Sequence, residues 1–291
     1  MTRHDPLVLA ERDCGRVVDV GQPLHRRIEA TLADFRRDFA ASIRATEARH
    51  HIRYVPGCAD LGDFDATSTT MALSPVQAED VAPRGAIDST FARYWEFFVR
   101  RRDGLEKWDA FTPYEIRNIG AFVRLGWRDR AQQLVDWFLA HRSPPGWAQW
   151  AEVVWNQPKE AHFIGDLPHT WVGSDFVRSM LDCFAYEREK DESLVLAAGV
   201  PSAWLREGPG VAVRDLHTWY GPLSYSLKGD ERALSLEIEA GVRVPRGGLV
   251  IAAPGVSSSW RATVNGSPAP IGTDGRLTVR VVPATIELRA R

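Results

Sequence analysis

The spacing of hydrophobic residues changes about two thirds of the way along this 291-residue chain, and this change most constrains its fold. Up to about Gly199, apolar residues recur at steps of three and four, which is the spacing of one helical face. Beyond Gly210, short runs of alternating or β-branched residues are separated by Gly, Pro, Asn and Asp, which is typical of strands joined by turns. We therefore predict a mainly helical domain followed by an antiparallel β-sandwich.

Helical spacing is clearest in residues 23–49, 84–104 and 171–191 and in two neighbouring segments, 112–127 and 128–142. Thr112 is a candidate cap with Pro113 in the first turn, and the very short connection to residue 128 predicts an antiparallel helical hairpin. Such hairpins build a partial α/α toroid. Residues 1–20 contain neither a sustained period nor a strong turn signal, so whether they are ordered is left open.

Seven short strands are expected in the last ninety or so residues, which suits a small sandwich. The turn at Gly229 and Asp230 predicts a hairpin between two of them. We place the domains at 1–203, helical, and 204–291, β-sandwich. The expected strands lie at 211–216, 221–228, 233–240, 248–253, 260–266, 276–282 and 284–290.

Charge and cysteine content exclude several classes of protein. The formal net charge of −2 and the pI near 6.5 provide no positive field for nucleic acid or an anionic membrane, so we expect neither as a partner. Cys14, Cys58 and Cys183 have no zinc or disulfide spacing and suit a reducing compartment. With no apparent export signal or membrane span, we expect a cytoplasmic location, although a chain cut from a longer protein would say nothing about targeting.

Gly146–Trp171 gathers four tryptophans, Trp147, Trp150, Trp155 and Trp171, around Glu152. Apolar walls raise the pKa of a carboxyl group and suit it to general acid or base work, and indole faces stack on sugar rings, so this mixture is typical of a glycosidase subsite. The alternative is structural: the tryptophans fill a core while Glu152 pairs with an arginine at its rim. His169 offers a hydrogen bond to a substrate hydroxyl or, alternatively, a structural contact.

Other acidic residues are weaker candidates. Asp63 and Asp65, with Asp60, precede a predicted helix, where capping explains one or two of them and leaves one free to meet substrate. Glu115 lies in the first turn of a helix, where the helix dipole alone stabilises an acid. Asp166 and Asp175 are interpreted as caps of the helix that begins near His169.

Metal and nucleotide chemistry find little support. His50 and His51 are adjacent and point in different directions, and no acid follows them at ligand spacing. The sequence has no dinucleotide-binding GxGxxG after a strand, no phosphate loop and no GxSxG nucleophile elbow. We expect no metal site and no organic cofactor.

The order of these motifs resembles the C-terminal half of the six-hairpin, (α/α)6-barrel glycosidases. Within that superfamily the chain is most similar to the α-L-rhamnosidase group, glycoside hydrolase family 78, and its uncharacterised relatives. The likeness extends over roughly residues 22–291. The motifs that carry it are "GDFDATSTTMALSP", "TPYEIRNIGAFVRLGWRDRAQQLV", "GWAQWAEVVW", "HFIGDLPHTWVGSDFVRSML" and "GVAVRDLHTWYGPLSYSLK".

The resemblance implies that Glu152 matches the catalytic base, which activates water in an inverting hydrolysis. It also implies that His169 and the tryptophans belong to a sugar pocket. The sequence departs from the family in two ways: Ala151 replaces the usual tryptophan before the acid, and the first hairpins with the acid-bearing loop have no counterpart upstream of Gly21. We therefore expect a fragment or a truncated product, whose exposed apolar helix faces favour self-association or docking onto a missing N-terminal barrel region.

Two functions follow as hypotheses. The first is a glycoside hydrolase-like protein with Glu152 as base, in which Asp63, Asp65 or Glu115 replaces the missing acid if the fold holds it about 6.5–9.5 Å from Glu152. The second is a non-catalytic carbohydrate-binding or scaffold module that has kept the architecture without the acid. Both take a carbohydrate ligand.

Overall fold

The computed structural model describes residues 21–78, 81–157, 161–206 and 208–291, without the side chains of residues 21–23. Residues 1–20, whose order the sequence leaves open, lie outside this description. The helices are α2 (Gly21–His50), α3 (Ala66–Leu73), α4 (Arg84–Arg102), α5 (Arg117–Arg124), α6 (Arg128–Ala140), α7 (Thr170–Phe184) and α8 (Ser202–Arg206), with 3₁₀ turns η1 (Pro113–Ile116) and η2 (Glu189–Asp191).

The strands of the described residues form three sheets. A small pair joins β1 (Ala110–Phe111) to β2 (Val154–Trp155). The larger sheets have the orders β10-β9-β12-β7-β6-β5 and β11-β8-β4-β3. Their strands are β3 (Ala185–Arg188), β4 (Ser193–Leu196), β5 (Val211–Thr218), β6 (Gly221–Gly229), β7 (Ala233–Ile238), β8 (Gly248–Ile251), β9 (Arg261–Val264), β10 (Ser267–Ala269), β11 (Leu277–Val279) and β12 (Ala284–Arg289).

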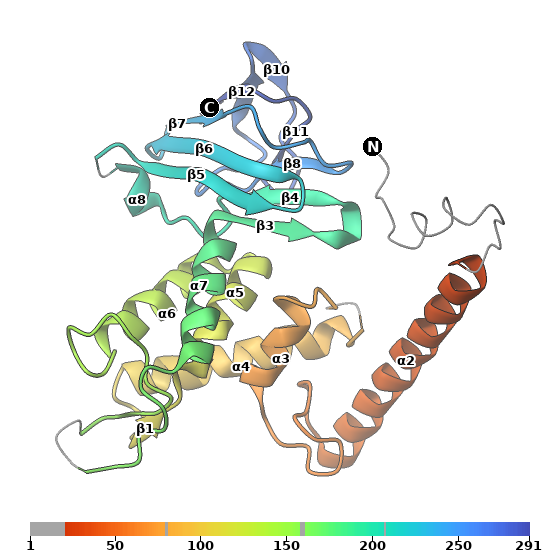
Figure 1. Cartoon of the computed structure of the whole chain (residues 1–291), viewed down its shortest axis with the longest axis vertical. Coiled ribbons are helices and arrows are strands. Elements are labelled where there is room, and N and C mark those ends of the chain that lie inside the picture. Colours follow the sequence, from red (N-terminus) through yellow and green to blue (C-terminus); the bar gives the residue numbers. More distant parts are fainter. Residues whose placement is uncertain (1–20, 79–80, 158–160, 207) are drawn as a thin grey trace, which may run out of the picture. The chain divides into compact units, whose positions relative to one another are not determined.

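The predicted fold class, a helical domain followed by a C-terminal antiparallel β domain, is confirmed. Figure 1 shows the helices α5, α6 and α7 together, followed by the layered strands. Alternate residues of the strands in both larger sheets are buried in one core, for example Leu194, Leu236 and Leu249, which makes the β part a sandwich. The expected turn at Asp230 is present, since its carboxylate accepts from the amides of Arg232 and Ala233. One pair, β4 with β8, is parallel.

The chain divides into two compact units. One comprises Ala66–Gln77 and Phe91–Arg291, and the other comprises Ala78–Thr90 and the residues up to Asp65. In the second of these, α2 presents a row of exposed apolar side chains at helical spacing and buries only its C-terminal end, at Ile43 and Thr46. None of the helices in the described part of the chain is both long and apolar enough to cross a membrane.

Aromatic packing holds α4, α5 and α6 together. Phe91 and Phe98 of α4 are fully buried, and Phe91 meets Phe122 of α5 edge to face. Phe98 meets Trp137 of α6 in the same manner, with ring centroids 5.7 Å apart. Each such pair adds about 0.5–1.5 kcal/mol beyond the burial of its surface. The apolar residues from which these helices are predicted are therefore the residues through which the helices pack against one another.

The predicted continuation of the helix from residue 171 to residue 191 is wrong. Helix α7 ends at Phe184, and the chain continues directly into β3, which pairs with β4. The hairpin between these strands contains Glu192 in a left-handed conformation, with φ of 50°, so it lacks the Gly, Asn or Pro that normally indicates a turn. Both strands lie before the predicted domain boundary at residues 203 and 204. The position of this boundary stays a prediction.

Cys183 provides a test of this packing. Its thiol is buried at the end of α7, and burial raises its pKa to about 12. Cys58 is exposed. At pH 8 the thiolate fraction of Cys183 is on the order of one in ten thousand, so we expect a thiol reagent to modify Cys58 and spare Cys183. In a Cys14→Ser chain, an aromatic disulfide reagent should titrate one thiol when the protein is native and a second only in guanidinium. Rapid native reaction of both thiols contradicts the burial of Cys183.

Candidate functional site

The turn η1 connects several parts of the structure through neighbouring residues. As predicted, Thr112 caps it, with Pro113 at its start, and the Thr112 hydroxyl also donates to the carbonyl of Glu152 at 3.0 Å. Two residues on, the Tyr114 hydroxyl lies 2.5 Å from Nε2 of His169. Residues brought together from positions 112, 152 and 169 thus share one hydrogen-bonded site.

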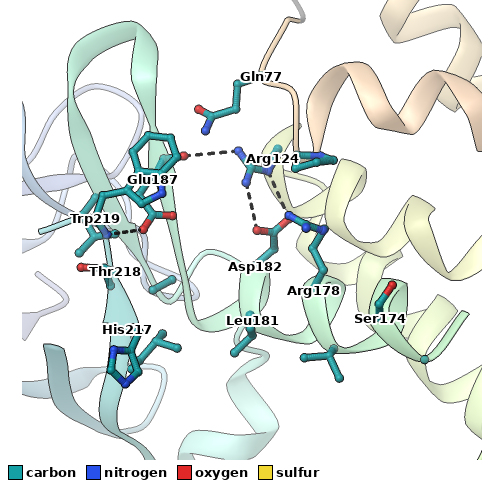
Figure 2. Close-up of a pocket in the computed structure, with 16 residues that line it drawn as sticks. Gln77, Arg124, Ser174, Arg178, Leu181, Asp182, Glu187, His217, Thr218 and Trp219 are labelled. Atoms are coloured by element: carbon teal, nitrogen blue, oxygen red, sulfur yellow. Dashed lines mark hydrogen bonds and ion pairs between the residues drawn. The ribbon is translucent and has the colours of Figure 1, made fainter. Parts of the chain in front are cut away.

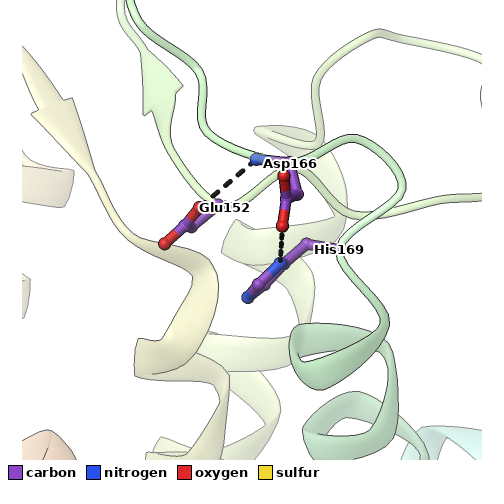
Figure 3. A group of neighbouring side chains, drawn as sticks. All are labelled: Glu152, Asp166 and His169. Carbon is purple, nitrogen blue, oxygen red and sulfur yellow. Dashed lines mark hydrogen bonds and ion pairs between the residues drawn. The ribbon is translucent and has the colours of Figure 1, made fainter.

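Glu152, Asp166 and His169 form the centre of this site, as Figure 3 shows. Glu152 and Asp166 are joined by backbone and side chain: the Glu152 amide donates to the Asp166 carbonyl, and the Asp166 amide donates to Glu152 Oε2 at 3.2 Å. Nδ1 of His169 lies 3.8 Å from the Asp166 carboxylate. Glu152 is half-buried and forms no ion pair with an arginine among the described residues, so the predicted structural alternative for its side chain does not apply.

Gly165 makes this arrangement possible. Its φ is +64°, in the left-handed region that favours glycine. A Cβ at this position would lie within 2.6 Å of Glu152 Cβ, so any larger residue would displace the glutamate. The loop therefore brings its backbone close to the carboxylate.

Trp171 provides an exposed aromatic surface next to these groups. Its ring is held edge to face against Tyr114, with centroids 5.7 Å apart, and the Arg117 guanidinium lies 5.4 Å from its centroid. Arg117 is itself held by Asp175 at 2.6 Å. Because 59% of Trp171 remains exposed while one part of the ring is fixed, the indole offers a preset stacking surface.

Electrostatics in the site follow from partial burial. Burial raises the pKa of Tyr114, and the negative charge of Glu152 adds to this effect, so the phenol is protonated at neutral pH and can donate to His169. Burial also raises the pKa of Asp175, although Arg117 acts in the opposite direction. Asp175 pairs with Arg117 and so positions its guanidinium. It does not cap α7, although the sequence predicts such a cap.

The other predicted tryptophans have different surroundings. Trp150 is 7% exposed and packs against Phe176, so its ring has no open face on which a sugar could stack. Trp155 is half-buried, stacks on His162 and donates to the carbonyl of Phe163. Trp147 is 54% exposed. The backbone of Trp150 does serve the site, since its carbonyl accepts from the His169 amide at 2.7 Å.

Glu115 faces the interior rather than Glu152. Its carboxylate accepts two hydrogen bonds from the guanidinium of Arg101, at 2.7 and 3.0 Å, and a third from Tyr94 at 2.8 Å. Arg101 also lies 4.5 Å from the ring centroid of Trp137. Burial lowers the pKa of Arg101, but the bonds and charge of Glu115 outweigh burial and raise it overall. This ion pair explains Glu115 as a structural residue.

Asp63 and Asp65 belong to the other compact unit. Asp63 accepts from the amide of Cys58 and thereby closes the loop before α3, which is a loop contact and not a cap of the helix. Their proposed contact with substrate stays a prediction.

Metal binding was not expected, yet the centre of the site offers ligands for an ion. One ligand atom from each of Glu152, Asp166 and His169 lies within 4.8 Å of the others. Oxygen and imidazole donors together suit a divalent transition metal more than calcium or magnesium. Asp166 is largely exposed, however, and such groups are common on surfaces without an ion.

Sequence reasoning missed Tyr114 and Arg117 as site residues and treated Asp166 only as a cap. Tyr114 follows the Thr-Pro start of a helix, and this start is the one local signal that could have identified it. The role of Arg117 depends on α7, which is distant in sequence, and carries no local signal.

No family model and no curated protein matches the chain. Among solved structures, it is similar to the structure of an α-L-rhamnosidase from Dictyoglumus thermophilum, with 11% sequence identity and a TM-score of 0.45. The alignment covers 84% of this chain and 28% of that chain, so this chain spans little more than a quarter of the other's length. A likeness at this level establishes neither a family nor an activity, and the expected relation to glycoside hydrolase family 78 stays a prediction.

The buried pair of Arg101 and Glu115 can be tested by stability. In Glu115→Gln the guanidinium keeps its charge and loses its counter-ion, so we expect the free energy of unfolding to fall by about 3–5 kcal/mol. Glu106→Gln is the matched control, because Glu106 pairs with Arg100 at the surface and should change stability by less than about 1 kcal/mol. Equal losses in urea denaturation for the two variants would show that Glu115 is not a structural anchor.

Proposed function

We propose that this chain is a glycoside hydrolase-like protein that binds a glycoside at Glu152, His169 and Trp171. The observation that carries the proposal is the exposed indole of Trp171, held by Tyr114 and Arg117, where Tyr114 also contacts His169 of the Glu152 cluster. An indole face stacks on the C–H face of a sugar, and carboxylate and imidazole groups bind its hydroxyls. Trp147 and Trp155 would add further aromatic surface for stacking against the sugar.

In the catalytic form of this proposal, Glu152 is the general base of an inverting hydrolysis. It would take a proton from water as the oxygen attacks the anomeric carbon, while a protonated acid gives its proton to the departing oxygen. Inversion needs the two carboxyl groups about 6.5–9.5 Å apart, to admit the water. The sequence predicts Asp63, Asp65 or Glu115 as this acid. Glu115 is occupied by Arg101, and the other two belong to the other compact unit.

The second candidate function is carbohydrate binding without hydrolysis. The distance between Glu152 and Asp166 favours it, because ligand oxygens of these two carboxylates lie within 4.8 Å of one another. That separation leaves too little room for a water between base and acid in an inverting reaction. Asp166 is therefore assigned to sugar binding and not to the role of general acid. Whether the protein hydrolyses a glycoside or only binds one, its cytoplasmic location and its self-association stay predictions.

The first test separates catalysis from binding. Aryl glycosides of common hexoses and of L-rhamnose would be assayed with the native chain, Glu152→Gln and Asp65→Asn. If the protein is an enzyme, loss of the base or the acid should lower kcat by about 10²–10⁴-fold. Glu231→Gln, a surface variant paired with Arg206, is the control and should leave the rate unchanged. Equal rates for native and Glu152→Gln chains would remove Glu152 from the mechanism.

The second test concerns binding alone and does not require hydrolysis. Calorimetry with the same sugars should show that Trp171→Ala weakens binding about tenfold, which corresponds to about 1.4 kcal/mol. Leu105→Ala, which truncates another exposed apolar residue, is the control. We expect binding to persist in EDTA; its loss on chelation would mean that an ion at Glu152, Asp166 and His169 holds the sugar. Absence of any sugar binding contradicts both forms of the proposal.

A further inference from the structure

Helix α7 has an unusual distribution of side chains. Its buried side carries Asp175, Ser179 and Asp182 in addition to Val172 and Cys183. Each of the three polar residues has a partner: Arg117, the Ile116 carbonyl and Arg124, respectively. Its exposed side includes Val177 and Leu181, which are 54% and 40% exposed. A helix on the surface of a protein normally turns its polar residues outward and its apolar stripe to the core, so α7 departs from this pattern in part. The outer side of α7 therefore leaves apolar surface available for a ligand.

A cavity of about 490 Å³ lies over this side of α7. Figure 2 shows Leu181, Arg178 and Ser174 on one wall and His217, Thr218 and Trp219 on the other. Its volume is within the range of small-molecule sites, roughly 300–1,000 Å³. Glu152, Asp166 and His169 do not line it, so the cavity is separate from the site described above.

Trp219 lies in the short turn between β5 and β6, and its backbone is held at both polar groups. Its amide donates to the Glu187 carboxylate at 3.0 Å, and its carbonyl accepts from Arg243 at 3.2 Å. The Thr218 hydroxyl spans the same turn by donating to the carbonyl of Gly221. The indole nevertheless remains 52% exposed. A fixed backbone that presents an open aromatic ring at a cavity is a preorganised stacking surface.

The polar groups around the cavity match a neutral ligand with many hydroxyls. Two arginines, Arg124 and Arg178, are balanced by Asp182 and Glu187, so the lining provides no excess charge for an anion or a cation. Arg124 is engaged by Asp182. Arg178 has no hydrogen bond or ion pair with the described residues and is free to donate.

We propose that this cavity is a second carbohydrate-binding site, in which a neutral saccharide stacks on Trp219 over the apolar side chains of α7. The saccharide's hydroxyls bind Arg178, Glu187 and His217. The inference does not depend on the proposed chemistry at Glu152, because no residue is shared between the two sites. In such a protein the second site would hold a saccharide chain without acting on it.

The test uses the full chain and a panel of neutral mono- to tetrasaccharides, with binding measured by calorimetry. Trp219→Ala and Arg178→Ala should each raise the Kd of the bound saccharide by about tenfold or more. Their matched controls, Val281→Ala and Arg214→Ala, remove an exposed apolar and an exposed basic side chain of the β-sandwich outside the cavity and should change the Kd less than twofold. Unchanged circular dichroism shows that the variants are folded.

Trp171→Ala separates this inference from the function proposed for Glu152. The binding event that Trp219→Ala removes should persist in Trp171→Ala, whether or not that variant loses a second event. If Trp219→Ala and Arg178→Ala bind every saccharide as the native chain does, the inference is overturned. Failure of the native chain to bind any saccharide in the panel overturns it as well.

Discussion

The ion pair between Arg101 and Glu115 determines where the candidate site lies. It holds η1 against α4, with both side chains almost completely buried and with a third bond from Tyr94. Three residues close to Glu115 in the chain then hold other segments in place. Thr112 binds the backbone of Glu152, Tyr114 binds His169, and Arg117 binds Asp175 of α7. Losing the counter-ion of Arg101 would loosen all these contacts together, since they share one turn. Glu115 thus supports the site through its charge without meeting a ligand.

Helix α7 contributes residues to both proposed binding sites. Asp175, Ser179 and Asp182 on its inner side are engaged by other parts of the chain, while Val177 and Leu181 on its outer side remain exposed. Trp171 near its start serves the site at Glu152, and Val177 and Leu181 further along line the cavity under Trp219. Two aromatic surfaces of similar design, each fixed by polar contacts and open on one side, are therefore associated with one helix.

Much of the fold could be predicted from the sequence because its signals are local. The apolar row from Leu24 to Ile43 predicts α2, and alternation in residues 233–238 and 284–289 predicts two paired strands of the sandwich. The hairpin of β3 and β4 could not be predicted, because Phe184 continues the helical row and Glu192 occupies the turn where a glycine would have been informative. The site was predicted in part. Glu152 and His169 lie together, and Tyr114 contacts both His169 and Trp171. The approach of Asp166, however, depends on the path of the loop through Gly165, and burial of Trp150 depends on contact with Phe176. Such contacts are set by tertiary packing, which no local pattern reveals.

The account rests on Trp171 and Glu152 forming a place where a sugar binds. The most direct test is a crystal structure of the protein soaked with the saccharide that binds most tightly in calorimetry. The account predicts a sugar ring stacked on the indole of Trp171, with hydroxyls within hydrogen-bond distance of Glu152 and His169. A saturated crystal in which these three side chains contact no sugar would contradict it.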